Sequence, residues 1–307
     1  MVKFGVDVGG TTVKIGLFES TGKLIEKYEI PTDKTGMGSH IIDDITEKMK
    51  CILEDKGINI RDCRGVGVGL PGPVDRDGNI IGCVNLGWGI FNVEKEFSDK
   101  FFHIPVKAAN DANAAALGEQ SAGAGRGMKN LVMVTLGTGV GGGVICDGKI
   151  VTGAGGAAGE IGHMPVNSEE SDVCSCGKKG CLEQYASATG VVRMAKKGMK
   201  KYPDTILNSE CTAKDIFDAA KKGDPLAGET ADHMCRYLGT ALASVACLIN
   251  PECIVIGGGV SRAGAILTEG VEKYFQEAVF KPCRKVKFVL AELGNDAGIY
   301  GAAALIN

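Results

Sequence analysis

The sequence predicts an α/β protein with two lobes built around a duplicated strand–glycine turn–strand core. Short apolar runs alternate with helical patterns along the chain, which is the order typical of α/β proteins. Glycine clusters follow several of these runs, and the segments GGTTVKIGL at 9–17 and GTGVGGGVI at 137–145 repeat the same form. A chain of 307 residues is long enough to give each lobe its own hydrophobic core.

Composition limits the class of protein and its partners. The chain is 44% hydrophobic and 23% charged with a net charge of −3, so no nucleic acid partner is expected. Three of its 12 cysteines cluster at 174–181, and the other nine are scattered among apolar neighbours instead of forming a disulfide pattern, which predicts a cytoplasmic location. The sequence has no basic leader and no run of about 18 apolar residues, so no membrane association is expected.

The first half of the chain begins with a buried strand at Val2–Val8, indicated by its apolar, valine-rich run. A tight GGTT turn and a second strand at 13–18 follow. Apolar residues at helical spacing predict a helix over 38–56, and a glycine- and valine-rich run predicts a strand at 65–70. The helix expected at 110–119 opens with polar capping residues ahead of an alanine run.

The second half is expected to repeat this alternation. Its predicted elements, in order, are a strand at 131–136, a solvated basic helix at 191–202, a helix from Thr212 to Gly223 opened by a capping-box pattern, a helix from Pro225 to Ile249, a strand at 253–256, and an alanine-rich helix at 294–307. The last helix is expected to return to the N-terminal lobe.

The stretch from Gly153 to Glu183 predicts a metal site. It holds one imidazole and three thiols, and the glycines of the turn CGKKGC allow the sulfurs to converge; the four ligands are His163, Cys174, Cys176 and Cys181. Three thiolates and one imidazole are the ligands of a closed tetrahedral zinc site. The alternative, a set of small buried thiols, is disfavoured because the cysteines cluster around glycine spacers.

Glycine-rich turns at the ends of three strands predict phosphate binding, because backbone N–H groups freed by tight turns form anion sites. The candidate residues are Asp7, Gly9, Gly10, Thr11, Thr12, Gly137, Thr138, Gly139, Gly257, Gly258 and Gly259. The threonines add hydroxyl donors, and the Asp7 carboxylate suits Mg²⁺ beside the phosphates. One such loop by itself is weak evidence, since ordinary tight turns also need glycine.

Asn110 and Asp111 allow two interpretations. They can cap the helix that follows, or Asp111 can orient a substrate hydroxyl and accept its proton. The polar side chains of Glu160, His163 and Glu183 flank the metal cluster and would supply acceptors for a polyhydroxylated substrate. This context favours the catalytic interpretation.

These residues resemble the ROK family (repressors, open reading frames and kinases) from residue 6 to about residue 302. The matching motifs are Asp7-x-Gly-Gly-Thr11, GLPGPVD at 69–75, Asn110-Asp111-Ala-Asn113, LGTGVGGG at 136–143, Gly159-Glu160-Ile-Gly-His163 and Cys174-x-Cys176-Gly-x-x-Gly-Cys181-x-Glu183. The resemblance implies the actin/hexokinase-like ATPase fold and an ATP-dependent sugar kinase, with transfer to the 6-hydroxyl of glucose as the first expectation.

The resemblance also implies roles for individual residues. Asp111 would be the base, while Asn110, Glu160, His163 and Glu183 would bind the sugar. Gly257–Gly259 would lie near the adenosine, Zn²⁺ would be structural, and Mg²⁺ would accompany ATP. The smaller lobe is expected to span 1–115 and 295–307, and the larger lobe, with the zinc and adenosine sites, 116–294. A homo-oligomer, either dimer or tetramer, is expected.

Several alternatives remain open at this point. The sugar can be fructose, mannose, allose or N-acetylmannosamine, and polyphosphate can replace ATP in some relatives. The chain can also be a sugar-sensing regulator without catalysis, although the presence of Asp7, Asp111 and both phosphate loops speaks against it. Many family members carry a DNA-binding domain ahead of the sugar domain, whereas this sequence reaches Asp7 at once.

Overall fold

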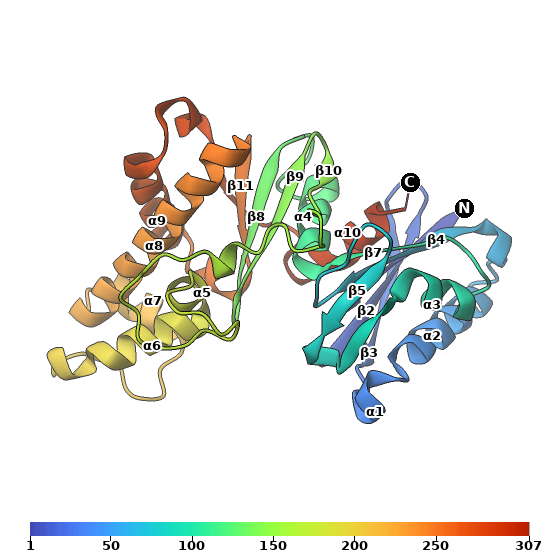
Figure 1. Ribbon diagram of the computed structural model, residues 1–307, viewed down its shortest axis with the longest axis horizontal. Helices are drawn as coiled ribbons and strands as arrows, with labels where there is room; N and C mark the ends of the chain where they lie inside the picture. The colour runs from blue at the N-terminus through green and yellow to red at the C-terminus, as the bar shows by residue number, and fades with distance from the viewer. Residues whose placement is uncertain (307) are drawn as a thin grey trace.

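The first of two five-stranded sheets is built from the N-terminal part of the chain. The computed structural model describes residues 1–306 and shows two lobes, each around one sheet (Figure 1). In the first sheet the strands run in the order β3-β2-β1-β4-β7, antiparallel from β3 to β1 and parallel from β1 to β7. The strands are β1 (Val2–Val8), β2 (Thr12–Glu19), β3 (Leu24–Pro31), β4 (Cys63–Leu70) and β7 (Val106–Asn110).

The second sheet repeats this topology. Its order is β10-β9-β8-β11-β12, again antiparallel across the first three strands and parallel across the last three. The strands are β8 (Leu131–Leu136), β9 (Val140–Cys146), β10 (Lys149–Ile150), β11 (Cys253–Gly257) and β12 (Lys287–Leu290). The duplicated strand–glycine turn–strand core predicted from the sequence is therefore confirmed, since β1–β2 and β8–β9 are equivalent hairpins.

Most helices belong clearly to one lobe or the other. The first lobe contains α1 (Thr35–Gly38), α2 (Ile41–Asp55) and α3 (Val93–Lys100), together with the small hairpin of β5 (Asn79–Cys83) and β6 (Trp88–Asn92). The second contains α5 (Glu183–Ala186), α6 (Ala188–Gly198), α7 (Ala213–Lys221), α8 (Pro225–Ile249) and α9 (Ala265–Ala278). No helix within residues 1–306 has the length and apolar character needed to cross a membrane.

The predicted capping signals of two helices are confirmed. Thr212 and Asp215 form a reciprocal capping box at the start of α7. Asp224 caps α8 by accepting a hydrogen bond from the Ala227 N–H at 2.9 Å, and Pro225 occupies the first helical position. Both capping bonds join residues three positions apart, and the Asp224 carboxylate is also held by hydrogen bonds from the Thr205 hydroxyl and the Ile206 N–H.

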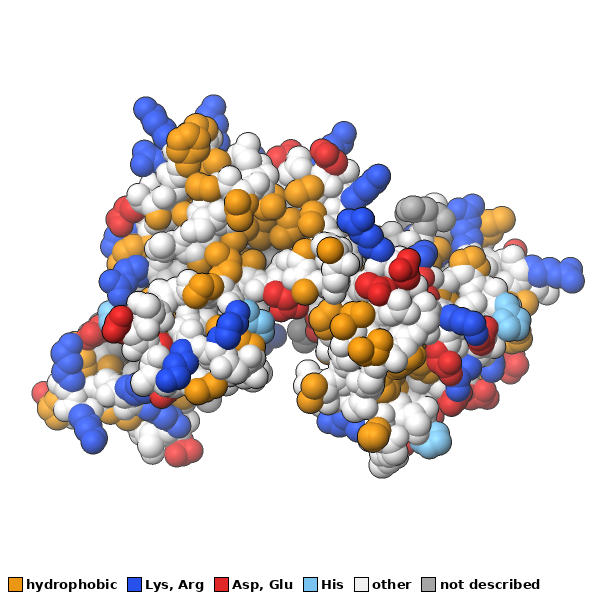
Figure 2. All heavy atoms as spheres, in the orientation of Figure 1, with side chains coloured by type: hydrophobic (Ala, Val, Ile, Leu, Met, Phe, Trp, Pro, Cys, Tyr) orange, Lys and Arg blue, Asp and Glu red, His pale blue; other side chains and the backbone are white. Residues whose placement is uncertain are grey.

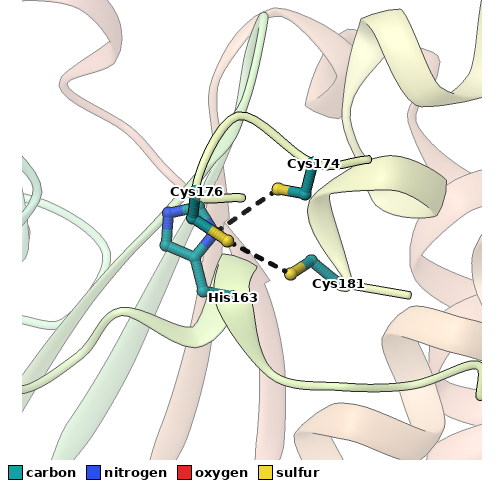
Figure 3. A group of neighbouring side chains, drawn as sticks. All are labelled: His163, Cys174, Cys176 and Cys181. Carbon is teal, nitrogen blue, oxygen red and sulfur yellow. Dashed lines mark hydrogen bonds between the residues drawn. The ribbon is translucent and has the colours of Figure 1, made fainter. Parts of the chain in front are cut away.

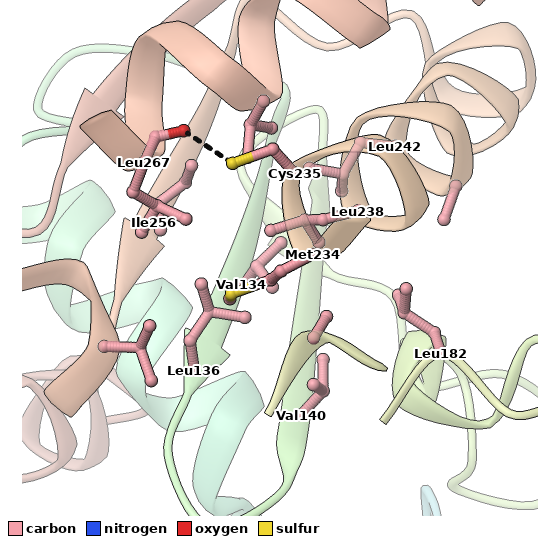
Figure 4. Close-up of a cluster of buried hydrophobic side chains, with 14 of the residues drawn as sticks. Val134, Leu136, Val140, Leu182, Met234, Cys235, Leu238, Leu242, Ile256 and Leu267 are labelled. Carbon is pink, nitrogen blue, oxygen red and sulfur yellow. Dashed lines mark hydrogen bonds between the residues drawn. The ribbon is translucent and has the colours of Figure 1, made fainter. Parts of the chain in front are cut away.

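Buried apolar side chains form one main cluster in each lobe. In the larger lobe, α8 packs Met234 and Leu238 against Val134 of β8 and Ile256 of β11 (Figure 4). The smaller lobe packs the apolar face of α2 against β1, β2 and β4. Because each sheet has its own core, the strand ends that carry the glycine turns are held rigidly.

Two helices lie between the sheets and pack against each other closely at a glycine. α4 (Asp111–Ala122) and α10 (Ala297–Ala304) pack so closely that a Cβ on Gly301 would lie 1.6 Å from the Ala114 carbonyl oxygen. α10 also covers β1, so the C-terminal helix lies beside the N-terminal strand (Figure 1).

The helix predicted at 294–307 is shorter than expected, and Asn307 lies outside the described residues. The lobe boundary predicted at 115/116 falls inside α4 and stays a prediction.

Candidate active site

A cleft of about 990 Å³ opens between the two lobes, and the space-filling view shows the hollow between them (Figure 2). Both lobes contribute to its lining. The predicted site residues that line it are Asp7, Asn110, Asp111, Gly137, Thr138, Gly139, Glu160, His163, Glu183, Gly258 and Gly259. Residues predicted from distant parts of the sequence are thus brought to one place.

The remaining residues predicted to bind ATP lie outside the cleft lining. Gly9, Gly10, Thr11 and Thr12 form the turn that follows Asp7, and Gly257 is the last residue of β11. None of these five is among the described residues that line the cleft, so their phosphate-binding role stays a prediction.

Asn110 and Asp111 occupy the junction between β7 and α4. The Asn110 Oδ1 accepts hydrogen bonds from the N–H groups of Ala112 at 2.9 Å and Asn113 at 3.2 Å, so Asn110 is the N-cap. Asp111 is the first helical residue, and its side chain faces the cleft. Asn110 is therefore the N-cap of the pair, and the catalytic role of Asp111 stays a prediction.

The surroundings of Asp111 suit a proton acceptor. Burial removes water from around the Asp111 carboxylate and raises its pKa. The hydrogen bond from the Ala112 N–H opposes this shift, and the nearby negative charge of Glu160 adds to it. A carboxylate with a raised pKa is a stronger base than an ordinary aspartate.

Asp7 is half-buried at the end of β1. Burial raises the pKa of Asp7 to about 6, the charge of Asp111 adds to the shift, and Lys14 opposes it. Gly298 lies so close that a Cβ there would be 2.5 Å from the Asp7 carboxylate. Burial and the negative charge of Asp111 both disfavour the ionised form of Asp7, and a divalent cation bound beside it would favour that form.

The two equivalent glycine turns have similar internal hydrogen bonds. The Gly9 N–H donates to the Thr12 carbonyl at 3.0 Å, and the Gly137 N–H donates to the Gly139 carbonyl at 3.0 Å. The first glycine of each turn therefore uses its N–H within the turn. A Cβ on Gly10, Gly137 or Gly259 would meet no atom within 4 Å, so open space adjoins the backbone there.

The His163 and cysteine cluster has the geometry of a metal site (Figure 3). The four ligand atoms lie within 4.8 Å of one another, with 3.6 Å between the Cys176 and Cys181 sulfurs and 3.8 Å between the Cys174 sulfur and His163 Nδ1. Sulfurs bonded tetrahedrally to zinc at about 2.3 Å lie about 3.8 Å apart. The donor set and its spacing therefore fit a tetrahedral zinc ion.

The metal cluster adjoins the cleft through His163. The imidazole turns Nδ1 toward Cys174, while His163 also belongs to the cleft lining. Metal binding through Nδ1 leaves Nε2 free to contact a ligand. Two carboxylates, Glu160 and Glu183, line the same part of the cleft.

Sequence reasoning missed several cleft residues. Lys14, Asn85, Thr135, Ser261, Arg262 and Asn295 also line the cleft. Lys14 and Thr135 lie in strands and the other four in short 3₁₀ helices, and no local motif marks any of them. The basic helix α6 was interpreted as solvated only, yet Arg193, Lys196 and Lys197 line a groove of about 730 Å³ that adjoins Thr138.

Comparison with known proteins gives consistent matches over the full length. The family model described as "ROK family" matches residues 3–307. A glucokinase of Halalkalibacterium halodurans is 43% identical over 98% of this chain and 94% of its own length. A glucokinase of Thermotoga maritima is 36% identical over 98% of this chain and 96% of its own length.

Solved structures agree with these sequence relatives. The crystal structure of a ROK family glucokinase from Streptomyces griseus, in complex with glucose and AMPPNP, superposes with a TM-score of 0.79 at 32% identity. The match covers 100% of this chain and 99% of that one. The predicted actin/hexokinase-like ATPase fold is therefore confirmed.

Proposed function

We propose that this chain, which belongs to the ROK family, is a glucokinase that transfers the γ-phosphoryl group of ATP to the 6-hydroxyl of glucose. One observation carries the proposal. A single cleft contains Asp111, a set of polar side chains beside the metal cluster, and the glycine turn of β8–β9. These are the base, the sugar site and the phosphate site that such a reaction requires.

Asp111 acts as the base in this reaction. It accepts the proton of the sugar hydroxyl as the bond between O6 and the γ-phosphorus forms and the bond to ADP breaks. The Asn110 side chain is held by its capping bonds, and its amide nitrogen lies 3.5 Å from the Gly72 carbonyl oxygen. Asn110, Glu160, His163 and Glu183 bind the ring hydroxyls, and the glycine turns bind the phosphates of ATP.

Zinc has a structural role in this proposal. Held by His163, Cys174, Cys176 and Cys181, it would fix the ring of His163 and the loop ahead of Glu183. Mg²⁺ bound with ATP would neutralise phosphate charge, and Asp7 is the carboxylate placed to assist it. The adenosine would lie near Gly257–Gly259, whose last two residues line the cleft.

The cellular setting follows from the same reasoning. All twelve cysteines within the described chain are free thiols, which supports a cytoplasmic location. The predicted dimer or tetramer stays a prediction that the mass of the protein in solution will test.

The proposal is tested by incubating the purified protein with ATP, Mg²⁺ and a panel of sugars while ADP release is followed. Glucose should give the highest kcat/KM and glucose 6-phosphate as product, because a site built from hydrogen bonds to several ring hydroxyls rejects sugars with misplaced ones. A higher kcat/KM for fructose, mannose, allose or N-acetylmannosamine would restrict the proposal to sugar kinase. Tight sugar binding without any ADP release would favour a regulator, and polyphosphate is included as a second donor.

A further inference from the structure

The carboxylate of Glu183 is held from two sides. Its Oε1 accepts a hydrogen bond from the Ser175 hydroxyl at 3.2 Å, and its Oε2 accepts one from the Val140 N–H at 3.0 Å. Ser175 stands between two of the metal-binding cysteines, and Val140 follows the glycine turn of β8–β9. Glu183 therefore joins the loop of the metal-binding cysteines (residues 174–181, the metal loop) to the glycine turn of β8–β9 (residues 137–139, the phosphate loop).

This arrangement leaves room for a sugar. An ionised carboxylate offers about four lone-pair sites, and Ser175 and Val140 use one on each oxygen. The Cys174 sulfur also lies 3.9 Å from Oε1, but a thiolate bound to zinc has no proton to donate. The remaining sites can accept hydrogen bonds from ring hydroxyls in the cleft, which Glu183 lines. Ser175 is not part of that lining within residues 1–306, so its effect on a sugar passes through a neighbour: Glu183, or Cys174, whose sulfur lies 3.7 Å from the Ser175 hydroxyl.

The phosphate loop limits where Glu183 can stand. A Cβ on Gly139 would lie 2.2 Å from Glu183 Oε2, so any side chain there would displace the carboxylate. Two further bonds join this loop to the start of α6: the Ala188 N–H donates to the Gly137 carbonyl at 2.8 Å, and the Thr189 hydroxyl donates to the Thr138 carbonyl at 2.7 Å. The segment that follows Glu183 is thus anchored to the loop that carries Gly139.

We propose that Ser175 is a positioning residue for sugar binding, and that the Gly139 backbone sets sugar affinity together with it, because both fix the Glu183 carboxylate. The inference rests on the proposed function for the identity of the sugar. It predicts that two changes outside the sugar contacts, one in the metal loop and one in the phosphate loop, weaken sugar binding even when no nucleotide is present.

The first test measures the Kd for glucose by calorimetry without ATP. Ser175→Ala should raise this Kd roughly tenfold, since it removes a hydrogen bond to a charged acceptor. Ser175→Thr keeps a hydroxyl and should restore most of the affinity. The matched control is Ser168→Ala, which removes an exposed hydroxyl that donates to Glu169 at the same 3.2 Å and should leave the Kd unchanged.

The second test separates this effect from simple loss of the metal. Zinc per chain is measured for each variant and should be unchanged in Ser175→Ala. Gly139→Ala leaves the metal loop intact, and its Cβ should raise the Kd for glucose at least as much as Ser175→Ala. If Ser175→Ala loses zinc, its higher Kd has two explanations, loss of the metal and displacement of the Glu183 carboxylate. The Kd of Gly139→Ala then decides between them.

The inference is wrong if Ser175→Ala keeps its zinc and binds glucose within twofold of the unmodified protein, or if folded Gly139→Ala does so. Calorimetry needs no turnover, so this failure is distinct from failure of the proposed function. The proposed function fails when the unmodified protein phosphorylates no sugar of the panel, whereas the inference requires only that it binds glucose.

Discussion

The Asn110 side chain accepts a hydrogen bond from the Asn113 N–H at 3.2 Å and thereby caps α4. Asp111, the next residue, is left at the first helical position with its carboxylate facing the cleft. Asn110 is the N-cap, and the Asp111 Oδ1 adds a hydrogen bond from the Ala112 N–H at 2.8 Å, which the amide oxygen of an asparagine at position 111 can also accept. This division of roles makes a substitution at Asp111 a direct test of catalysis.

We expect Asp111→Asn to lower kcat by at least about 10³-fold with little change in glucose Kd, because the amide keeps the shape of the side chain but cannot accept the proton. ADP release and calorimetry measure the two quantities. Asn110→Asp is the control for capping, since Asp and Asn are equally good N-caps and α4 should keep its stability. An Asp111→Asn variant with half the normal rate would remove Asp111 from the mechanism.

We expect purified protein to contain about one zinc per chain, held by His163 and the three cysteines of the cluster. Cys176→Ser should lose the metal and much of the glucose affinity, through His163 and Glu183, while ATP-phosphate contacts are largely kept. Cys51→Ser changes an exposed thiol on α2 and is the matched control. Elemental analysis without zinc would refute the site, and metal loss without a change in glucose Kd would separate zinc from sugar binding.

The pKa of Asp7 leads to a prediction on stability. Its rise from 3.8 to about 6 in the folded protein means that the ionised carboxylate costs up to about 3 kcal/mol. The favourable contribution of the protonated form is complete below pH 3.8 and is lost as the pH rises through about 6. Asp7→Asn should therefore raise the Tm of the ligand-free protein at pH 8 and have little effect at pH 4.

Thermal unfolding of both proteins at several pH values checks this prediction. The same variant should lose kinase activity, because the amide cannot supply negative charge for Mg²⁺. A lower Tm for Asp7→Asn at pH 8, or a difference in Tm that does not vary with pH, would contradict the assigned state of Asp7.

The sequence predicted those parts of the site that local spacing determines. The metal ligands Cys174, Cys176 and Cys181 lie within eight residues of one another, and the glycine turns directly follow their strands, so each pattern is complete within a short segment. Asn and Asp cap helices equally well, so the sequence alone does not say which of Asn110 and Asp111 is the N-cap; the hydrogen bonds of Asn110 do.

Other parts depend on contacts between distant segments. The bond between Glu183 and the Val140 N–H joins residues 43 positions apart, and nothing near either residue predicts it. Lys14 and Asn85 enter the cleft singly from the smaller lobe, one from a strand and one from a short 3₁₀ helix. Residues of this kind are identified only when the tertiary fold places them.

The packing of α4 against α10 gives a final prediction, on the joint between the lobes. Gly301→Ala would place a Cβ 1.6 Å from the Ala114 carbonyl oxygen, so the two helix backbones must separate. We expect a loss of about 3 kcal/mol or more, the upper range for an overfilled core, and a lower Tm in thermal unfolding. Gly228→Ala is the matched control, because Gly228 lies within α8 and a Cβ there would meet no atom within 4 Å. Alanine is the better helix former, so this control should raise stability by about 0.5–1 kcal/mol. Equal Tm values for the two variants would show that the close contact of α4 and α10 does not hold the lobes together.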